Sequence, residues 1–241
     1  MNSKVEHKYS ELIEIFDQKT GWHKARVKFF VSFICAMCKL QTVSFVKLSQ
    51  GFEGAASYES NLRRIQRFFA GYSVDFDLIA KIIFGLLPVE PPYGLSMDRT
   101  NWKFGQLDIN ILMISVNYKG VGIPLIWTLL PKRGNSNCSE RKELMRRYIK
   151  LFGTSSIDSF MADREFIGQT WFKELIDQNI DFHIRIKENM WINVPGKPKK
   201  KAFWIFNDLK YNQVYQYPKI VRIGSELVYL TGLKTFNRKA W

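Results

Sequence analysis

A proline-rich segment at residues 88–94 divides the chain into two parts with different hydrophobic periodicity. Before this segment, apolar residues recur at the three- and four-residue spacing of helices, whereas after it they form runs typical of strands. Pro88, Pro91 and Pro92 lack a backbone N–H and hold the residue before them extended, so a helix does not continue through them. We therefore expect an all-helical domain over residues 1–87, followed by an α/β domain.

The helical part contains one segment, residues 58–70, with a clear division between its two faces. Its apolar side chains are expected on one face, at Leu62, Ile65, Phe68 and Phe69. Its basic side chains fall largely on the other, at Arg63, Arg64 and Arg67. With the helix expected at residues 42–50, it resembles a helix-turn-helix arrangement whose arginines reach phosphates or guanine edges. An ordinary solvated arginine face is the alternative.

The second part predicts alternating strands and helices. The expected strands cover residues 95–104, 108–118, 121–130, 157–162 and 181–186, and the expected helices cover residues 139–152 and 169–178. This order, β-β-β-α-β-α-β, is that of the ribonuclease H-like mixed sheet, in which the first and fourth strands lie side by side. The predicted fold class is therefore α/β, with an N-terminal all-α domain.

Two aspartates, Asp98 and Asp163, each end an apolar strand-like run and each precede an arginine. A carboxylate at the end of a buried strand is costly to desolvate unless it meets a cation. On neighbouring strands, the two carboxylates can share divalent ions for chemistry on phosphates. Mg²⁺, or Mn²⁺ in its place, suits such an oxygen-only site.

Three motifs in residues 95–190 resemble those of insertion-sequence transposases with an Asp-Asp-Glu triad, in the branch with a β-rich insertion. They are Ser-Met-Asp-Arg-Thr-Asn-Trp around Asp98, Ala-Asp-Arg-Glu-Phe-Ile-Gly around Asp163, and Ile-Arg-Ile-Lys at residues 184–187. The resemblance implies a DNA transposase that binds terminal inverted repeats and target DNA as a homodimer, and that cuts and joins strands. It also implies that Asp98 and Asp163 are its first two catalytic and metal-binding residues.

The third acid of that family stands in a Tyr-x-x-Arg-x-x-x-Glu-x-x-x-x-x-x-Lys helix after the insertion, and no such pattern precedes Trp241. The chain therefore resembles a C-terminally truncated member, with an incomplete catalytic core at residues 95–187 and the start of the insertion at residues 188–241. Short alternating runs are expected there around residues 203–206, 213–217, 219–223 and 227–230. Glu165 is a candidate substitute ligand, although pairing with an arginine is the favoured interpretation.

A net charge of +14, spread over both ends of the chain, favours nucleic acid as the partner, with solubility as the alternative. Arg99 and Arg164 are candidate phosphate contacts, although neighbouring acids also explain them. The lysines Lys197, Lys199, Lys200 and Lys201 are expected to follow a DNA backbone or to form a solvated loop. Trp191 and Trp204 are compared with a tryptophan that stacks on a flipped base in related hairpin-forming transposases. Burial in a core is their default interpretation.

Other features limit the class of protein. The longest apolar stretch, residues 29–37, is too short to span a bilayer, and three cysteines do not suggest a disulfide framework. A cytoplasmic protein is therefore expected, and the resemblance to insertion-sequence transposases implies a bacterial, nucleoid-associated one. Two alternatives remain open, namely a catalytically inactive DNA-binding remnant that inhibits the full-length transposase, and another ribonuclease H-like nuclease.

Overall fold

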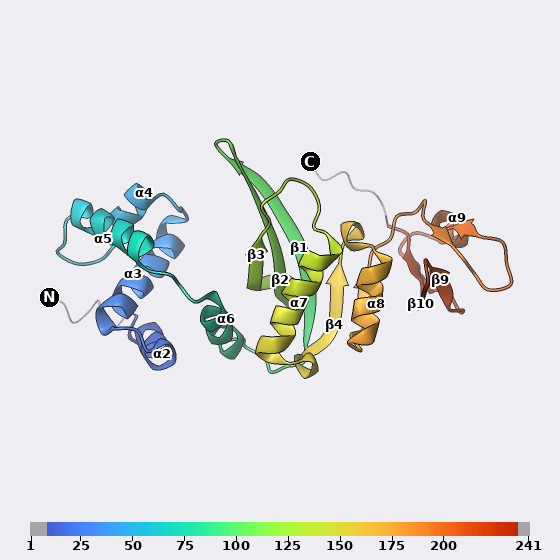
Figure 1. Cartoon of the computed structure of the whole chain (residues 1–241), viewed down its shortest axis with the longest axis horizontal. Coiled ribbons are helices and arrows are strands. Elements are labelled where there is room, and N and C mark those ends of the chain that lie inside the picture. Colours follow the sequence, from blue (N-terminus) through green and yellow to red (C-terminus); the bar gives the residue numbers. More distant parts are fainter. Residues whose placement is uncertain (1–8, 236–241) are drawn as a thin grey trace. The chain divides into compact units, whose positions relative to one another are not determined.

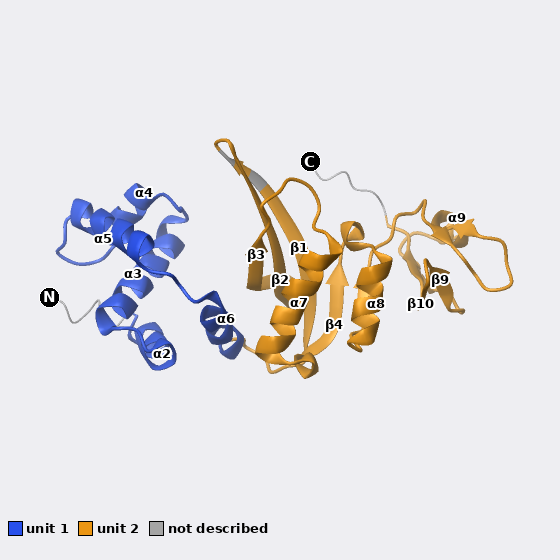
Figure 2. Cartoon of the chain, in the orientation of Figure 1, with its two compact units in different colours: residues 1–86 blue, residues 87–241 orange. Residues whose placement is uncertain are grey.

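The structure is a computed structural model that describes residues 9–235, apart from the side chains at positions 102 and 104. It divides into unit 1, residues 1–86, and unit 2, residues 87–241 (Figure 2). The division falls just before the proline-rich segment. The first eight residues of the helical domain predicted over residues 1–87 lie outside the described residues.

Unit 1 consists of helices in its described part. They are α2 (Ser10–Thr20), α3 (Lys24–Leu40), α4 (Phe45–Gln50), α5 (Tyr58–Gly71) and α6 (Phe76–Gly85). Helix α5 begins where the Ser57 side chain accepts a hydrogen bond from the Ser60 amide, and the Asp75 side chain caps α6 in the same way. These caps satisfy amides that have no partner within their own helix.

An aromatic core holds α3 and α5 together. Phe29, Phe33, Ile65 and Phe68 are buried in it. Phe69, which we predicted on the buried face, is 48% exposed, because it stacks on Phe45 at the edge of this core with ring centroids 5.0 Å apart.

Unit 2 is built on a mixed five-stranded sheet with the order β3-β2-β1-β4-β5. Its strands are β1 (Tyr93–Phe104), β2 (Leu107–Tyr118), β3 (Val121–Leu129), β4 (Ile157–Ala162) and β5 (Phe182–Ile184). The first three strands pair antiparallel, whereas β1 with β4 and β4 with β5 pair parallel. The prediction that the first and fourth strands are neighbours is confirmed.

Two helices, α7 (Cys138–Phe152) and α8 (Gln169–Asp177), lie over one face of this sheet (Figure 1). Helix α7 starts slightly before the predicted residue 139, because Asn137 and Glu140 form a reciprocal capping box. The side chains between the helices and the sheet include Met97, Phe160 and Trp171, all buried. Ile176, an apolar residue of the helix predicted at residues 169–178, is 44% exposed.

Residues after β5 form small paired strands and one short helix. These elements are β6 (Trp191–Ile192), β7 (Lys200–Lys201), α9 (Ala202–Phe206), β8 (Val214–Gln216), β9 (Val221–Ile223), β10 (Glu226–Val228) and β11 (Thr231–Leu233). The pairs are β6 with β7, β9 with β10, and β8 with β11. The prediction of an alternating strand at residues 203–206 is wrong, because a short apolar run does not distinguish a strand from a helix. A hydrogen bond between Gln169 and Ser225 ties this region to α8.

None of the helices in residues 9–235 is both long enough and apolar enough to cross a lipid bilayer.

Candidate active site

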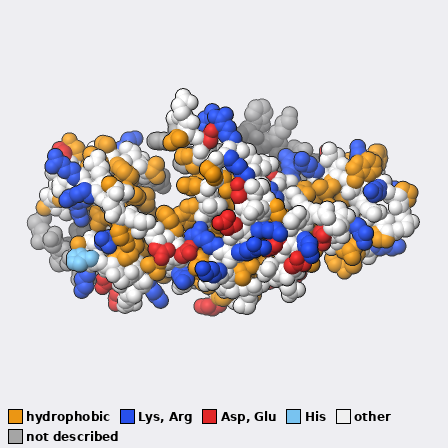
Figure 3. Space-filling view, in the orientation of Figure 1, with side chains coloured by type: hydrophobic (Ala, Val, Ile, Leu, Met, Phe, Trp, Pro, Cys, Tyr) orange, Lys and Arg blue, Asp and Glu red, His pale blue; other side chains and the backbone are white. Residues whose placement is uncertain are grey.

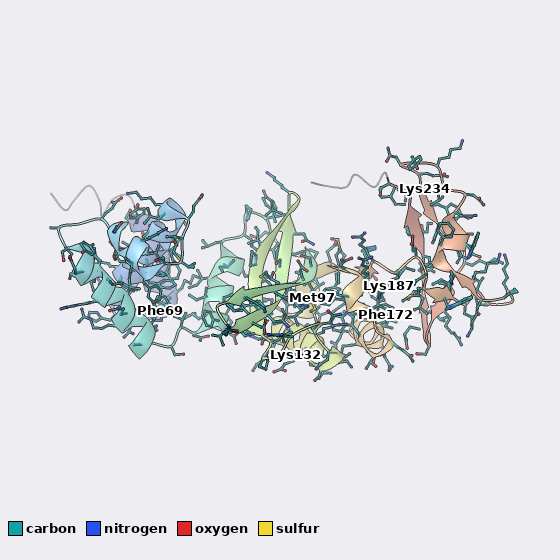
Figure 4. The ribbon with its side chains drawn as sticks, turned by 90° about the horizontal axis from the view of Figure 1, so that it is seen from above. Phe69, Met97, Lys132, Phe172, Lys187 and Lys234 are labelled. Atoms are coloured by element: carbon teal, nitrogen blue, oxygen red, sulfur yellow. The ribbon has the colours of Figure 1, made fainter. Side chains whose placement is uncertain are left out.

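Asp98 and Asp163 lie at the point where the pairing of two neighbouring central strands ends, Asp98 within β1 and Asp163 directly after β4. The last pair in the parallel register of β1 and β4 is Met97 with Ala162, so Asp98 and Asp163 come one residue later. The backbone at Asp163 is still extended, with φ −81° and ψ 173°, so side chains continue to alternate between the faces. Met97, labelled in Figure 4, is buried under the helices, and both aspartates therefore occupy the opposite face.

Both carboxylates are exposed and have few partners among the described residues. Asp98 Oδ1 accepts a 2.7 Å hydrogen bond from the Arg99 amide. Asp163 Oδ1 lies 3.5 Å from Arg185 Nη1, in a pair whose side chains are 52% and 82% exposed. Such an exposed ion pair contributes little energy, so a cation or a phosphate can displace it. Arg185 directly follows β5 and belongs to the Ile-Arg-Ile-Lys motif at residues 184–187, but the sequence analysis gave it no role of its own.

The two aspartates fit a magnesium or manganese ion in their chemistry. Mg²⁺ is commonly held by one or two carboxylates, with water and substrate phosphate at its other positions. Neighbouring strands lie about 4.8 Å apart, a spacing at which two carboxylates can reach a common ion. Residues 9–235 contain no cluster of three or more His, Cys, Asp or Glu side chains arranged for a metal.

Arg99 is held inside the protein by Glu165. Its Nε lies 3.1 Å from Glu165 Oε1 and its Nη2 lies 3.0 Å from Oε2, a two-point contact. The Arg99 side chain is only 8% exposed, and its guanidinium also reaches three asparagine side-chain oxygens, at Asn101, Asn110 and Asn135. The assignment of Arg99 as a DNA contact is corrected accordingly. Glu165 is paired with an arginine, as the favoured interpretation predicted.

Arg141 is a second arginine at this site, and the sequence analysis missed it. Its Nη2 donates to the Glu165 carbonyl at 3.1 Å and to the Ser136 carbonyl at 2.6 Å, while its guanidinium lies 5.0 Å above the Phe166 ring. Burial lowers the pKa of Arg141. The signal was present, because Arg141 is three and four residues before the inward-facing Leu144 and Met145.

The candidate DNA-binding arginines of unit 1 differ in exposure. Arg63 and Arg67 are exposed on α5. Arg64 is half-buried, with its guanidinium 5.5 Å from the Phe29 ring centre and its Nη1 3.3 Å from Asn61 Oδ1. The prediction that Arg64 belongs to the solvated face needs correction, because the aromatic core covers one side of its guanidinium. In unit 2, Arg164 is exposed beside Asp163.

Two tryptophans and three lysines line an open cavity after β5. Trp191 and Trp204 are each 60% exposed, so the default interpretation of buried aromatic side chains is wrong. Lys201 Nζ lies 5.7 Å from the centre of the Trp191 ring. The cavity measures about 650 Å³ and is lined by Trp191, Lys199, Lys200, Lys201, Trp204, Asn207 and Asp208. Lys197 is exposed on the neighbouring turn.

Charges over the helices of unit 2 are arranged in pairs. Figure 3 shows acidic side chains interspersed with basic ones over α7 and α8. Glu174 on α8 accepts contacts from Lys142 at 2.8 Å and from Arg146 at 2.9 Å, and the hydrogen bond from Lys142 is the main reason for its lowered pKa. These pairs neutralise part of the positive charge on this face.

No protein-family model matches the chain, and no curated protein matches it. Among solved structures, it is similar to the simian T-cell lymphotropic virus intasome, with 15% identity, a TM-score of 0.33, and 42% of this chain and 34% of that chain covered. The HTLV-2 integrase catalytic core domain in complex with magnesium has 14% identity, a TM-score of 0.31, and coverage of 41% and 63%.

The piggyBac transposase synaptic complex with hairpin DNA also resembles the chain, with 14% identity and a TM-score of 0.42, and with 87% of this chain and 52% of that chain covered. The chain thus spans less than two thirds of the length of each of these structures. At these scores the similarity carries no conclusion about function, so the proposal below depends on the residues themselves.

Proposed function

We propose that this protein is a DNA transposase of the insertion-sequence type with a ribonuclease H-like core, which cuts and joins DNA strands by metal-dependent phosphoryl transfer. One observation carries the proposal, namely the parallel pairing of β1 with β4 that brings Asp98 and Asp163 together. Two exposed carboxylates at the point where β1 and β4 stop pairing have no role in packing the sheet, whereas they suit a divalent cation.

In this proposal, Asp98 and Asp163 hold the ion on the open face of the sheet. Bound Mg²⁺ or Mn²⁺ supplies an activated water or 3′ hydroxyl and stabilises the leaving oxygen. Arg185, whose side chain is 82% exposed beside Asp163, would face a phosphate bound at this site. Arg164, exposed beside Asp163, is a second phosphate contact.

DNA binding is proposed to involve both units. Arg63 and Arg67 present positive charge from unit 1, which would recognise the terminal inverted repeats. In unit 2 the cavity beside Trp191 combines an exposed aromatic ring with three lysines, a combination that suits a base stacked on the ring and a phosphate backbone alongside. Two copies of the chain would act together on the paired ends of an element in the bacterial nucleoid.

A second candidate function is DNA binding without cleavage, as a remnant that inhibits an intact transposase. The exposure of Arg63, Arg67 and the lysine-lined cavity supports it, because these groups act independently of the two carboxylates. A different ribonuclease H-like nuclease would use the same carboxylates but would not need this cavity.

Nicking of labelled DNA in the presence of Mg²⁺ or Mn²⁺ tests the proposal. The substrates are duplexes from both flanks of the coding sequence, because the ends of an element lie there, together with an unrelated duplex of the same length. We expect the wild type to nick the flanking duplex with either ion. Asp98→Asn and Asp163→Asn should each lower the rate by at least about 100-fold, since each removes a metal ligand.

Asp158→Asn is the matched control, because Asp158 is an exposed aspartate at the start of the same strand as Asp163. This variant should nick as fast as the wild type. Binding of the flanking duplex without nicking by any variant would favour the DNA-binding remnant. Equal nicking of every duplex, still dependent on Asp98, would favour a general nuclease.

A further inference from the structure

We infer that the ion pair between Arg99 and Glu165 is a positioning device that sets the separation of the Asp98 and Asp163 carboxylates. The inference rests on the proposed metal site and assigns a role to two residues that do not touch the metal. The pair joins two segments that are 66 residues apart in sequence. Arg99 directly follows one aspartate, and Glu165 is two residues after the other.

The Arg99–Glu165 ion pair lies just beyond the point where backbone hydrogen bonds stop linking β1 and β4. The ladder between β1 and β4 ends at Met97 and Ala162, one residue before the aspartates. From Arg164 to Phe166 the chain turns into a short 3-10 helix and leaves the sheet. Among the described residues, the two-point contact between Arg99 and Glu165 therefore links the two segments beyond the aspartates, at 3.1 and 3.0 Å.

Glu165 is held from two directions. Arg99 binds its carboxylate, while Arg141 donates to its backbone carbonyl at 3.1 Å. The Phe166 amide donates to the Asp163 carbonyl at 3.0 Å, which fixes the turn that starts at the aspartate. Because Arg141 is itself buried and stacked on Phe166, the turn has a rigid support.

Arg99 is fixed in a similar way by asparagine side chains. Asn110 Oδ1 lies 3.3 Å from Arg99 Nη1, and the other side of this amide, Nδ2, donates to the carbonyls of Lys132 and Gly134 at 3.0 and 2.9 Å. This anchoring determines which way the Asn110 amide points. A guanidinium with paired contacts to a carboxylate and further oxygen acceptors has one well-defined arrangement.

The position of metal-binding carboxylates depends on such outer contacts. Loss of a residue that orients a ligand typically lowers metal affinity or activity by about 10- to 100-fold, although the ligand itself remains. If Asp98 and Asp163 share an ion, loosening the Arg99–Glu165 link lets the two segments separate. The predicted consequence is weaker metal binding with both aspartates still present.

The test measures Mn²⁺ binding by the full chain. The electron paramagnetic resonance signal of free Mn²⁺ reports how much of the ion is bound. Wild type, Asp98→Ala, Glu165→Gln and Arg99→Lys are compared, with Glu174→Gln as the control. Glu174 is a buried glutamate paired with basic side chains between α7 and α8, so it undergoes the same chemical change in a different ion pair. Thermal melting of each variant measures the purely structural effect.

We expect Glu165→Gln to raise the dissociation constant for Mn²⁺ by about 10- to 100-fold, while Glu174→Gln binds Mn²⁺ like the wild type. Arg99→Lys keeps the charge but loses the two-point contact, and should also weaken binding. If Glu165 were instead a direct ligand, Arg99→Lys would leave Mn²⁺ affinity unchanged or increase it, and the positioning role would be overturned.

Two further outcomes are distinguishable. Wild-type affinity in Glu165→Gln, together with loss of binding in Asp98→Ala, would overturn the inference and leave the proposed metal site intact. Equal binding by the wild type and Asp98→Ala would remove the proposed metal site and the inference with it. If Glu165→Gln melts far below Glu174→Gln, Arg99→Lys alone decides the question, since a lysine keeps the buried positive charge.

Discussion

The five-stranded sheet and the segment that follows it, residues 188–235, belong to one unit but differ in how far their large side chains are buried. In the sheet, Leu95, Ile114 and Phe160 are completely buried. In the following segment, Trp191 and Trp204 are each 60% exposed, and several other aromatic and aliphatic side chains are exposed with them. Charges differ too, because Arg99 is paired and covered, whereas the lysines at the cavity are open to solvent.

Strand length accounts for this difference. Strands β1 and β2 have 12 residues each, and together they bury side chains such as Leu95, Leu112 and Ile114 completely. The paired strands after β5 have two or three residues each, and two-stranded pieces of this size bury too little surface to be stable alone. The exposed aromatic and basic side chains there are consequently available to another molecule. The sheet provides rigid positions, and the later segment provides surface.

The largest effect on stability is expected from Phe160→Ala. Phe160 is fully buried in β4, with its ring 5.6 Å from the ring of Trp171. Truncation should lower the free energy of unfolding by about 3–5 kcal/mol, because it leaves a cavity between the sheet and α8. Urea unfolding measures the change. Phe203→Ala, at a half-exposed phenylalanine in α9, is the control, and an equal loss there would contradict the contrast between the two regions.

A smaller effect is expected from Glu174→Gln. Loss of charge-assisted contacts with Lys142 and Arg146 should lower the free energy of unfolding by about 2 kcal/mol at neutral pH. The pKa of Glu174 is lowered in the folded protein, mainly by the hydrogen bond from Lys142, so its stabilisation is present above pH 4.5. It is lost as the pH falls through the lowered value. Unfolding from pH 7 to pH 3 should therefore show a smaller difference between wild type and variant in acid.

The acid dependence has a simple control. Glu143→Gln changes an exposed glutamate on α7. Its melting temperature should follow that of the wild type at every pH. A Glu174→Gln variant with the same deficit at pH 3 as at pH 7 would mean that packing, rather than charge, accounts for the loss.

Tyr148→Phe should cost about 1 kcal/mol at neutral pH, because it removes the 3.1 Å hydrogen bond between Tyr148 Oη and Ser156 Oγ. Burial raises the pKa of Tyr148 to about 12. Because burial disfavours the charged phenolate, the folded protein should lose stability as the pH rises from 10.0 towards 12. Thermal melting between pH 8 and pH 11 should show the wild type losing stability more steeply than the variant. Parallel curves would contradict this assignment.

The smallest effect is expected from Trp204→Ala. Because this ring is 60% exposed, the free energy of unfolding should change by no more than about 0.5 kcal/mol. The same variant should weaken binding of a fluorescent DNA oligonucleotide, since stacking on an exposed ring contributes about 1–3 kcal/mol per base. A large loss of stability with unchanged DNA binding would reverse the roles that we assign to the two regions.

Much of the sheet was predictable from the sequence. The bounds of β4 agree with the predicted residues 157–162, and the other four strands differ from their predicted ranges by a few residues at most. Apolar runs and turn residues act locally, so the pattern of nearby residues is sufficient to locate strands. Lys119 and Gly120, both with positive φ, make the predicted turn between β2 and β3.

Other features depended on contacts between distant residues or on short apolar runs. The segment Ala202–Phe206 forms a helix. The sequence did not predict this helix, because five mostly apolar residues are too few to show a helical or a strand periodicity. Arg64 packs against Phe29 and Phe52, although it belongs to a run of arginines that resembles an exposed face. Trp191 and Trp204 are exposed because the elements around them are only two to five residues long and cover little of each side chain.

The sequence by itself determined that the chain has a helical part and an α/β part, and that Asp98 and Asp163 belong to two strands that are neighbours, Asp98 within the first and Asp163 directly after the fourth. Backbone propensity and side-chain alternation act over a few residues, and strand order follows from the sequence of elements. Only the tertiary structure decided that Arg99 pairs with Glu165 and that Arg141 supports the turn at Arg164–Phe166. Each of these charges had several possible partners, and the choice among them depends on which residues the packed sheet and helix bring within hydrogen-bond distance.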